Sequence, residues 1–319
     1  DTRPASVGGT DPPAAELVML APMPVGRPTR VIYAGTPHIA VGPLRALHSA
    51  GFDIACVVTG ADVRRGRGSH VSPSPVKQAA RELGLNVVHD VRDVLDYAGP
   101  GTLGVVVAYG SLIPHDVLAR IPMANAHYSL LPRWRGAAPV ERAILAGDSV
   151  TGVCIMRVVD ELDAGEVYDR REIEIGPEES ADDLRARLDV IAQKMLVESL
   201  ERGSWVGRAQ EGEHCYARKI TTADRQVRVG SAELEARRVR IGGAFLSIAG
   251  QRVRILTAGV STRQAPSGAI RVVEGTVVLG CGDGSLELRL VRPEGKQQMA
   301  AMDWMRGRRD ADTLEIDHE

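Results

Sequence analysis

The sequence predicts an α/β fold in which an open, Rossmann-like, mostly parallel sheet is followed by a smaller C-terminal antiparallel β-barrel of the OB-like type. From residue 30 onward, short apolar runs alternate with amphipathic stretches, a pattern typical of strands and helices that follow one another. Beyond residue 224 the apolar runs are short and β-like, and turn pairs such as Glu274-Gly275 and Asp283-Gly284 separate them. Such spacing is typical of a small barrel.

The first domain is predicted from runs of apolar residues and from helical periodicity. Buried strands are expected at residues 31–34, 52–58, 103–108 and 153–158. Helices are expected between them at residues 76–83, 115–121 and 139–146. A long helix should close the domain, because Ser180 can cap it, Asp182 and Asp183 follow, and apolar residues then recur at helical spacing up to Gly203.

Changes in composition predict the domain boundaries, and the 319 residues suit two domains. Residues 1–29 contain six prolines and no sustained period, so we expect a mobile extension there. The remaining boundaries are a first domain at 30–206, a polar linker at 207–224, the barrel at 225–310 and a tail at 311–319. Barrel strands are expected at residues 252–256, 269–273, 276–280 and 286–291.

Charge is distributed unevenly along the chain. The net charge is -2, but residues 217–309 contain 17 Lys and Arg against 8 Asp and Glu, so this part carries +9 and the remainder -11. A basic C-terminal part on an acidic body predicts a polyanionic partner for that part alone. The alternative is an ordinary solvated surface.

Several classes of protein are disfavoured by the sequence. The four cysteines are widely spaced without a C-x-x-C pair, which indicates reduced, buried thiols in a cytoplasmic protein and no metal site. No apolar run reaches the ~20 residues of a membrane span, and prolines interrupt the apolar run at residues 17–25, so neither a membrane segment nor a secretory signal is expected.

The turn after the first expected strand does not have the pattern of a dinucleotide site. Gly35 stands there without the other glycines of G-x-G-x-x-G. We therefore expect Gly35 to shape the floor of a cleft at the carboxyl ends of the strands.

Three residues carry the side chains that acyl transfer to an amine would need. Asn125 and His127 are two positions apart, so in an extended segment both leave the same face. Asp163 would complete the set. The amide and the imidazole could hold an oxyanion, and the carboxylate could orient and charge the imidazole. His127 alone would indicate a hydrogen-bonded core histidine, and its partners favour catalysis.

A family resemblance rests on these motifs. Asn-Ala-His-Tyr-Ser-Leu-Leu-Pro at residues 125–132, with Leu-Asp-Ala-Gly at 162–165, resembles the signature of enzymes that use 10-formyltetrahydrofolate. The run Pro-Arg-Trp-Arg-Gly-Ala-Ala-Pro at 132–139 is similar to the methionyl-tRNA formyltransferase branch. Similar segments at 34–37, 66–68, 72–77, 107–110 and 293–296, with Met299, extend the resemblance over roughly residues 30–309.

The resemblance implies a formyl transfer from 10-formyltetrahydrofolate to the methionine of charged initiator tRNA, catalysed by Asn125, His127 and Asp163. The implied folate loop consists of Ser129, Leu130, Leu131 and Pro132, and candidates for the pteridine pocket are Tyr109, Leu112 and Ile113. Candidates for substrate contacts are Arg64, Arg65, Arg67 and Lys77 around a basic loop, and Arg135 at the rim of the cleft. We expect a monomer, a tRNA-binding C-terminal domain and no metal.

The chain departs from the family pattern at three places, which keeps alternatives open. Gly-Ala-Asp stands at residues 60–62 where Gln-Pro-Asp is usual, Arg228-Val229 stands near an expected Asp-Trp, and residues 241–245 replace a Pro-Trp-Pro segment. One alternative is a formyltransferase acting on a small amine or an amino sugar, although the run at 134–139 argues against it. Another is a hydrolase that delivers formyl to water, and a third is a non-catalytic RNA-binding module.

Overall fold

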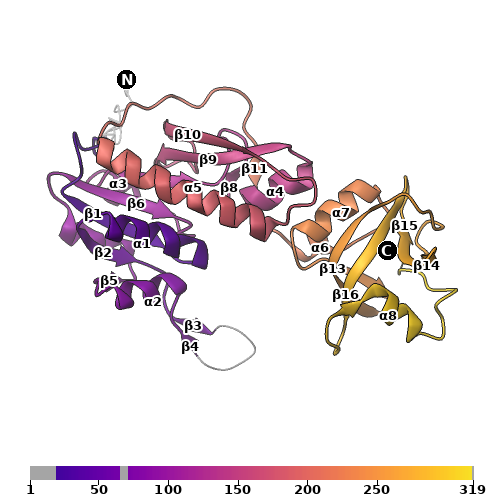
Figure 1. Ribbon diagram of the computed structural model, residues 1–319. Coiled ribbons are helices and arrows are strands. Elements are labelled where there is room, and N and C mark those ends of the chain that lie inside the picture. Colours follow the sequence, from indigo (N-terminus) through magenta and orange to yellow (C-terminus); the bar gives the residue numbers. More distant parts are fainter. Residues whose placement is uncertain (1–18, 65–70, 318–319) are drawn as a thin grey trace, which may run out of the picture.

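The computed structural model describes residues 19–64 and 71–317, which fold into two domains joined by a long connecting segment (Figure 1). The first domain contains a seven-stranded sheet in the order β10-β9-β7-β6-β1-β2-β5. Its strands are β1 (Arg30–Gly35), β2 (Ile54–Val58), β5 (Val87–Val88), β6 (Thr102–Val107), β7 (Met123–His127), β9 (Val150–Arg157) and β10 (Val167–Glu174). The predicted α/β fold with an open sheet is confirmed.

Strand direction in this sheet changes at β9. Strands β1, β2, β5, β6 and β7 run parallel, as the alternation of strands and helices predicts. Strand β9 pairs antiparallel with both β7 and β10. The strand expected at residues 153–158 therefore exists, but in the antiparallel part of the sheet, because a buried apolar run does not reveal strand direction.

Helices cover both faces of the sheet. Helices α1 (Val41–Ser49) and α5 (Ala181–Arg202) lie side by side on one face (Figure 1). The 3-10 segment η2 (Val91–Tyr97) and α3 (His115–Leu118) cover the other face, and α2 (Pro75–Glu82) and α4 (Pro139–Ala146) complete this domain with the short η1 (His38–Ala40). Successive strand residues enter opposite cores: Tyr33 packs with α1 and α5, and Ile32 with η2 and α3.

The long helix α5 begins and ends as the sequence predicts. The Ser180 hydroxyl accepts a hydrogen bond from the Asp183 N–H at 3.2 Å. At the other end Gly203 has φ +60°, and a Cβ there would lie 2.1 Å from the Gly26 carbonyl carbon, so glycine is required. The Gly26 N–H donates to the Gly203 carbonyl at 3.0 Å.

Residues 19–29 are thereby held against the domain, which differs from the mobile extension expected. The Ala21 N–H donates to the Leu118 carbonyl at 2.9 Å, and Arg27 Nη2 donates to the Ala50 carbonyl at 3.0 Å. Backbone hydrogen bonds do not require apolar residues at regular spacing. The sequence of this segment therefore has no pattern that predicts its packing on the domain. Residues 1–18 lie outside the described residues.

The C-terminal domain is an antiparallel sheet with two helices against it, α7 (Ala232–Arg240) and α8 (Ala301–Arg306). Its strands are β12 (Phe245–Ile248), β13 (Gln251–Ser261), β14 (Ile270–Val273), β15 (Thr276–Gly280), β16 (Ser285–Pro293) and β17 (Met299–Ala300). The sheet order is β12-β13-β16-β15-β14, with β17 on β16. The predicted antiparallel C-terminal domain is confirmed.

The C-terminal residues beyond 310 belong to this domain, whereas the sequence suggested a tail. Leu314 and Ile316 are buried in its core. The Ile270 N–H donates to the Leu314 carbonyl at 2.9 Å, and the Asp317 N–H donates to the Ser247 carbonyl at 2.8 Å. This segment therefore connects the two edge strands β14 and β12 by hydrogen bonds, and it protects both edges.

The expected linker also packs on the first domain. After α5 the chain passes over β10 and β9 and returns to β11 (Tyr216–Ala217), as Figure 1 shows. Backbone hydrogen bonds of 2.9 and 3.0 Å join Val167 and Arg208, and β11 runs parallel to the short β8 (Arg135–Gly136). Helix α6 (Thr222–Arg225) follows, and Arg142 of α4 donates to Asp224 at 2.8 and 3.0 Å.

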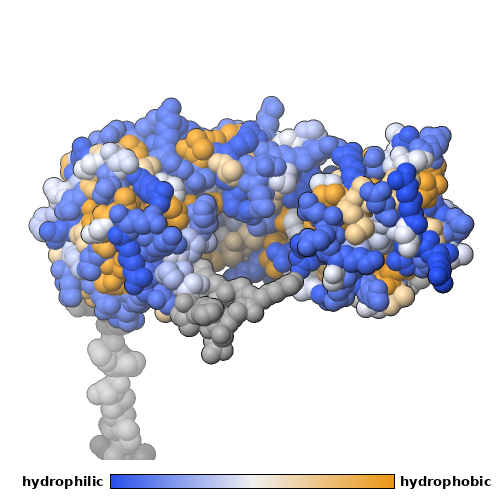
Figure 2. Space-filling view, turned by 60° about the horizontal axis from the view of Figure 1, so that its bottom comes forward, coloured by the Kyte–Doolittle hydropathy of each residue, from blue (hydrophilic) through white to orange (hydrophobic). Residues whose placement is uncertain are grey.

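The surface is mostly hydrophilic and is hollowed between the two domains on the face that Figure 2 shows. Among residues 19–64 and 71–317, none of the helices combines the length and the hydropathy that crossing a membrane requires.

We expect a thiol reagent at pH 8 to modify Cys215 well before the other three cysteines. Burial raises the pKa of Cys56 to about 12 and the pKa values of Cys154 and Cys281 to about 11, so these groups remain unreactive thiols. Cys215 is partly exposed. Peptide mass spectrometry of the alkylated folded protein measures the four rates, with denatured protein as the control. Equal rates at all four positions in the folded protein would contradict this expectation.

We expect Asp224→Asn to lower the free energy of unfolding by about 1 kcal/mol at pH 7, because charge-assisted hydrogen bonds to Arg142 are lost. These bonds lower the pKa of Asp224 below its ordinary range. A carboxylate whose pKa is lower in the folded chain than in the unfolded chain gives its full stabilisation above pH ~4. This stabilisation is lost as pH falls through the folded-state pKa. Urea unfolding should show a smaller difference between wild type and variant at pH 3 than at pH 7. If wild type and variant differ in unfolding free energy by the same amount at both pH values, an ion pair between Asp224 and Arg142 is contradicted.

Candidate active site

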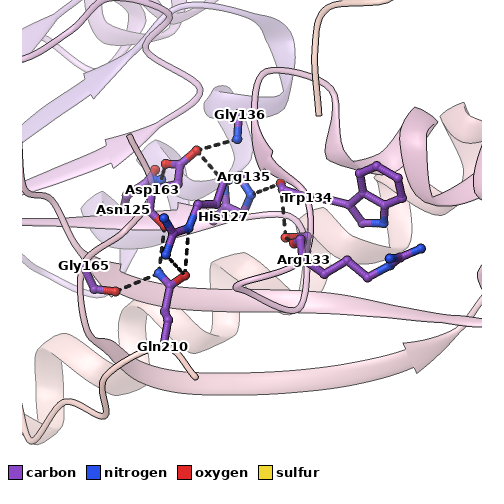
Figure 3. A network of polar contacts seen from close by, with 10 residues as sticks. Asn125, His127, Arg133, Trp134, Arg135, Gly136, Asp163, Gly165 and Gln210 are labelled. Carbon is purple, nitrogen blue, oxygen red and sulfur yellow. Dashed lines mark hydrogen bonds and ion pairs between the residues drawn. The ribbon is translucent and has the colours of Figure 1, made fainter. Parts of the chain in front are cut away.

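Three side chains predicted from the motif lie together at the carboxyl end of β7. Asn125 and His127 leave the same face of this strand, because side chains alternate along it. Asn125 Nδ2 lies 3.4 Å from Asp163 Oδ1, and His127 Nδ1 lies 3.6 Å from Asp163 Oδ2 (Figure 3). The strand thus supplies an amide and an imidazole, and the loop after β9 supplies a carboxylate.

The hydrogen bonds of His127 assign its two ring nitrogens. Nε2 lies 2.8 Å from the Trp134 carbonyl oxygen, and since a carbonyl only accepts, Nε2 carries a hydrogen. Nδ1 faces Asp163 at a distance beyond a hydrogen bond. The His127 side chain is 6% exposed and that of Asp163 is 12% exposed, so little water screens their interaction. Nδ1 is therefore the nitrogen available to a ligand.

The loop that carries Asp163 is tightly constrained. Asp163 has φ +50°, a left-handed conformation that few non-glycine residues adopt. Its Oδ2 accepts a hydrogen bond from the Gly136 N–H at 2.8 Å. A Cβ at Gly165 would lie 2.0 Å from the Arg157 carbonyl oxygen, so that position requires glycine. The spacing of Asp and Gly in the motif therefore follows from the close approach of the loop to β9.

The predicted folate loop forms a turn that supports His127. The Ser129 hydroxyl donates to the Arg133 carbonyl at 2.6 Å, and Leu131 is buried while Leu130 is partly buried. The bond between Leu131 and Pro132 is cis. The turn continues to Trp134, whose φ is +64° and whose carbonyl receives the imidazole hydrogen bond.

Asp148 holds the end of this turn. It accepts from Trp134 Nε1 at 2.7 Å, and from Arg133 Nε and Nη2 at 3.0 and 2.6 Å. The Arg133 guanidinium also stacks 4.5 Å from the centre of the Trp134 ring. Asp148 therefore fixes the turn that carries the Trp134 carbonyl, which is the group that faces His127.

The candidates for the pteridine pocket lie in the loop after β6. Tyr109 is buried in the core beside β6 and Ile113 packs against the same core, whereas Leu112 is 75% exposed. His115 Nδ1 lies 2.9 Å from Asp160 Oδ2, which joins this loop to the one that carries Asp163. The second loop reaches Asn125 through Asp163, and β6, which precedes the first loop, pairs with β7 at Asn125. Leu112 is exposed apolar surface in the first loop.

Two candidates for substrate contacts are already paired within the protein. Lys77 Nζ donates to Asp62 at 2.7 Å and lies 3.1 Å from His89 Nε2, and its side chain is 9% exposed. Arg135 is 7% exposed and Nη1 binds Glu161 at 2.8 Å. Both cations are themselves buried, and their acidic partners Asp62 and Glu161 lie nearer the surface, so each already has hydrogen-bond partners within the protein.

The basic loop follows β3 (Val63–Arg64) in the sequence and precedes β4 (Val71–Ser72), and these two strands form a short antiparallel hairpin. Lys77 supports the base of this hairpin through Asp62. Arg65 and Arg67 lie outside the described residues, and for Arg64 the backbone alone is described.

Some residues of the site were not predicted from the sequence. They are the Trp134 carbonyl, the Gly136 N–H and Gln210, which lies in the expected linker and contacts Arg135, Asp163 and Gly165 (Figure 3). A sequence pattern does not show which backbone groups will form hydrogen bonds at a site. Gln210 lies in a polar stretch and belongs to no recognisable motif. Across the described ranges, no three His, Cys, Asp or Glu side chains gather as a metal ion would require.

Comparison with known proteins identifies the family of the chain. A family model described as formyl transferase matches residues 29–200, and one described as formyl transferase, C-terminal domain, matches residues 236–309. The methionyl-tRNA formyltransferase of Paenarthrobacter aurescens is 37% identical over 296 residues, which cover 87% of this chain and 96% of that protein. That of Clavibacter michiganensis is 39% identical over 295 residues, which cover 87% and 97%.

Solved structures resemble the chain in fold. WlaRD, a sugar 3N-formyl transferase crystallised with dTDP and 5-N-formyl-THF, has a TM-score of 0.64 at 15% identity, covering 85% of this chain and all of that one. An N-formyltransferase from Helicobacter canadensis has a TM-score of 0.63 at 16% identity, covering 81% and 98%. The chain therefore belongs to the formyl transferase family, and the two relatives that it matches over almost their full length are methionyl-tRNA formyltransferases.

Proposed function

We propose that this chain transfers the formyl group of 10-formyltetrahydrofolate to the amino group of methionine on initiator tRNA. One observation carries the proposal: Asn125 Nδ2 and His127 Nδ1 lie 3.4 and 3.6 Å from the carboxylate oxygens of Asp163. They do so in a chain that is 37% and 39% identical to two methionyl-tRNA formyltransferases over almost their full length. The proposed steps use hydrogen bonds and a carboxylate and require no metal ion.

The first proposed step is attack of the neutral amine on the formyl carbon, which places negative charge on the formyl oxygen. Asn125 Nδ2 carries two hydrogens, of which one faces Asp163 at 3.4 Å and the other is left for that oxygen. His127 donates from Nδ1, because Nε2–H is committed to the Trp134 carbonyl. Two donors preset around a developing oxyanion lower the barrier without rearrangement.

Asp163 is proposed to carry the proton. The attacking amine becomes positively charged when its nitrogen bonds to carbon, and the carboxylate accepts a proton from it, directly or through a water molecule. The bond between carbon and N10 of the folate then breaks, and N10 takes up the proton that Asp163 accepted, which restores the carboxylate. The products are the formylated amine and tetrahydrofolate, with no net change in protons. The charge of Asp163 also stabilises a cationic His127 beside it.

The folate is proposed to lie between the loop after β6 and the loop after β9. Leu112 supplies exposed apolar surface, and the bond between His115 and Asp160 holds the two loops together. The turn from Ser129 to Pro132 supplies backbone groups at the far side of the site. Tyr109 and Ile113 then support this pocket from the core.

The tRNA is proposed to contact the basic hairpin and the C-terminal domain. Arg254 of β13 lies directly opposite Arg292 of β16, and Arg252 is two positions from Arg254. Like charges directly opposite one another destabilise a sheet, and Arg254 is exposed while Arg292 is partly exposed. A phosphate backbone supplies counter-charge to such a pair. We infer that the chain acts as a monomer in the cytoplasm, where charged tRNA is found.

We expect Asn125→Ala to lower kcat on the order of 10²-fold or more, because one oxyanion donor is lost. Turnover with 10-formyltetrahydrofolate and charged initiator tRNA measures the effect, and circular dichroism confirms the fold. Asn86→Ala, placed just before edge strand β5, is the matched control and should retain full activity. Near wild-type turnover of a folded Asn125→Ala variant would reject the assignment.

We expect labelled formyl to appear on charged initiator tRNA and not on charged elongator tRNA, small amines or water. The reaction should weaken steeply with salt, because phosphate contacts release counterions. Replacing Arg64, Arg65 and Arg67 by Gln should reduce that salt dependence. Replacing the exposed Arg45, Arg170 and Lys194 by Gln is the control, because it removes the same three charges from the first domain outside the hairpin. Formyl transfer to a small amine or an amino sugar, or release of formate without acceptor, would favour the corresponding alternative.

A further inference from the structure

The segment between the two domains reaches the site through Gln210. We propose that Gln210 is a positioning residue that holds Asp163 in its working conformation, so that the interdomain segment forms part of the active site. This inference rests on the proposed function, because Asp163 is the proton carrier there.

The amide of Gln210 uses all of its hydrogen-bonding capacity on the catalytic loops. Nε2 donates to the Asp163 carbonyl at 2.7 Å and to the Gly165 carbonyl at 2.9 Å. Oε1 accepts from Arg135 Nε and Nη2 at 3.0 and 2.9 Å (Figure 3). A side-chain amide has two donor hydrogens and one acceptor oxygen with two lone pairs. Its orientation is also fixed, since the reverse arrangement would set an NH2 group against a guanidinium.

Asp163 needs such support because its conformation is intrinsically unfavourable. At φ +50° a non-glycine residue is held only where its surroundings determine the backbone. Packing on this side is incomplete, since an open cavity of about 450 Å³ is lined by residues that include Arg135, Glu161, Gly165 and Gln210. Where packing is incomplete, directional hydrogen bonds decide the position of a loop.

The same segment also supports the partners of His127 and Asp163 on the opposite side. The Cys215 carbonyl accepts from the Arg135 N–H at 2.9 Å, and Cys215 Sγ accepts from the Trp134 N–H at 3.3 Å. Strand β11 pairs with β8, which contains Gly136, the donor to the Asp163 carboxylate. The interdomain segment therefore contacts Trp134, whose carbonyl faces the His127 imidazole, and Asp163, whose carboxylate faces it. Both residues have a positive φ.

Gln210→Glu tests the donor role at nearly constant size. The carboxylate still accepts from Arg135, but it has no hydrogen for the Asp163 and Gly165 carbonyls. We expect kcat to fall at least tenfold, with KM for both substrates within about threefold of wild type, because a small displacement of a catalytic group affects the transition state most. Glu211→Ala, an exposed neighbour, is the matched control and should leave both parameters unchanged.

A double-mutant cycle shows whether Gln210 acts through Asp163. In an Asp163→Asn background, Gln210→Glu should cost less than twofold in the rate of single-turnover transfer, because the group that it positions is already absent. A full additional tenfold loss in that background, or an unchanged kcat for Gln210→Glu alone, would overturn the inference. Wild-type activity of Asp163→Asn would instead overturn the proposed function.

Folding is monitored in every variant by circular dichroism and by the thermal midpoint. If Gln210→Glu does not fold, Gln210→Met provides the same test, because it is similar in length and also lacks the donor hydrogens. The inference is supported if Gln210→Met lowers kcat and the same substitution costs less than twofold in the Asp163→Asn background. A wild-type kcat for Gln210→Met opposes it.

Discussion

The site depends on the position of a single carboxylate, that of Asp163. It lies opposite His127 Nδ1, faces the amide of Asn125, and accepts a hydrogen bond from the Gly136 N–H. The two strand residues are placed by the regular alternation of β7, which the cores on both faces of the sheet determine. Asp163 stands on a loop in a left-handed conformation, and regular secondary structure does not fix it. Its position therefore requires several separate contacts.

Those contacts come from parts of the chain that are far apart in sequence. Gly165 allows the loop to approach β9, Gln210 binds the loop backbone, and Asp148 fixes the turn whose Trp134 carbonyl orients the imidazole. Each contact is a hydrogen bond or a close backbone approach, so the arrangement has directional precision that apolar packing does not supply. A site of this kind, with donors fixed before substrate arrives, suits a reaction in which charge develops on one oxygen.

The sequence predicted those features that depend on local periodicity or capping. It predicted β15 with its observed bounds, the cap of α5 by Ser180, and the shared face of Asn125 and His127. It did not predict that residues 19–29, 207–224 and 311–317 pack on the domains, because much of this packing depends on backbone hydrogen bonds and on isolated side chains such as Leu314 and Ile316. The sequence also did not reveal that Arg135 is buried and bound to Glu161 and Gln210, because pairing between residues far apart in the chain leaves no local pattern.

The most direct test of the account is a crystal structure of the protein with 5-formyltetrahydrofolate, which does not transfer its formyl group. The account predicts the pterin between the loops that follow β6 and β9, beside Leu112, with the formyl-bearing edge directed toward Asn125 and His127. It also predicts Asn125 Nδ2 and His127 Nδ1 within about 3 Å of a ligand or water oxygen at the position of the oxyanion. A pterin bound elsewhere, or a His127 rotated so that Nδ1 no longer faces Asp163, would contradict the account.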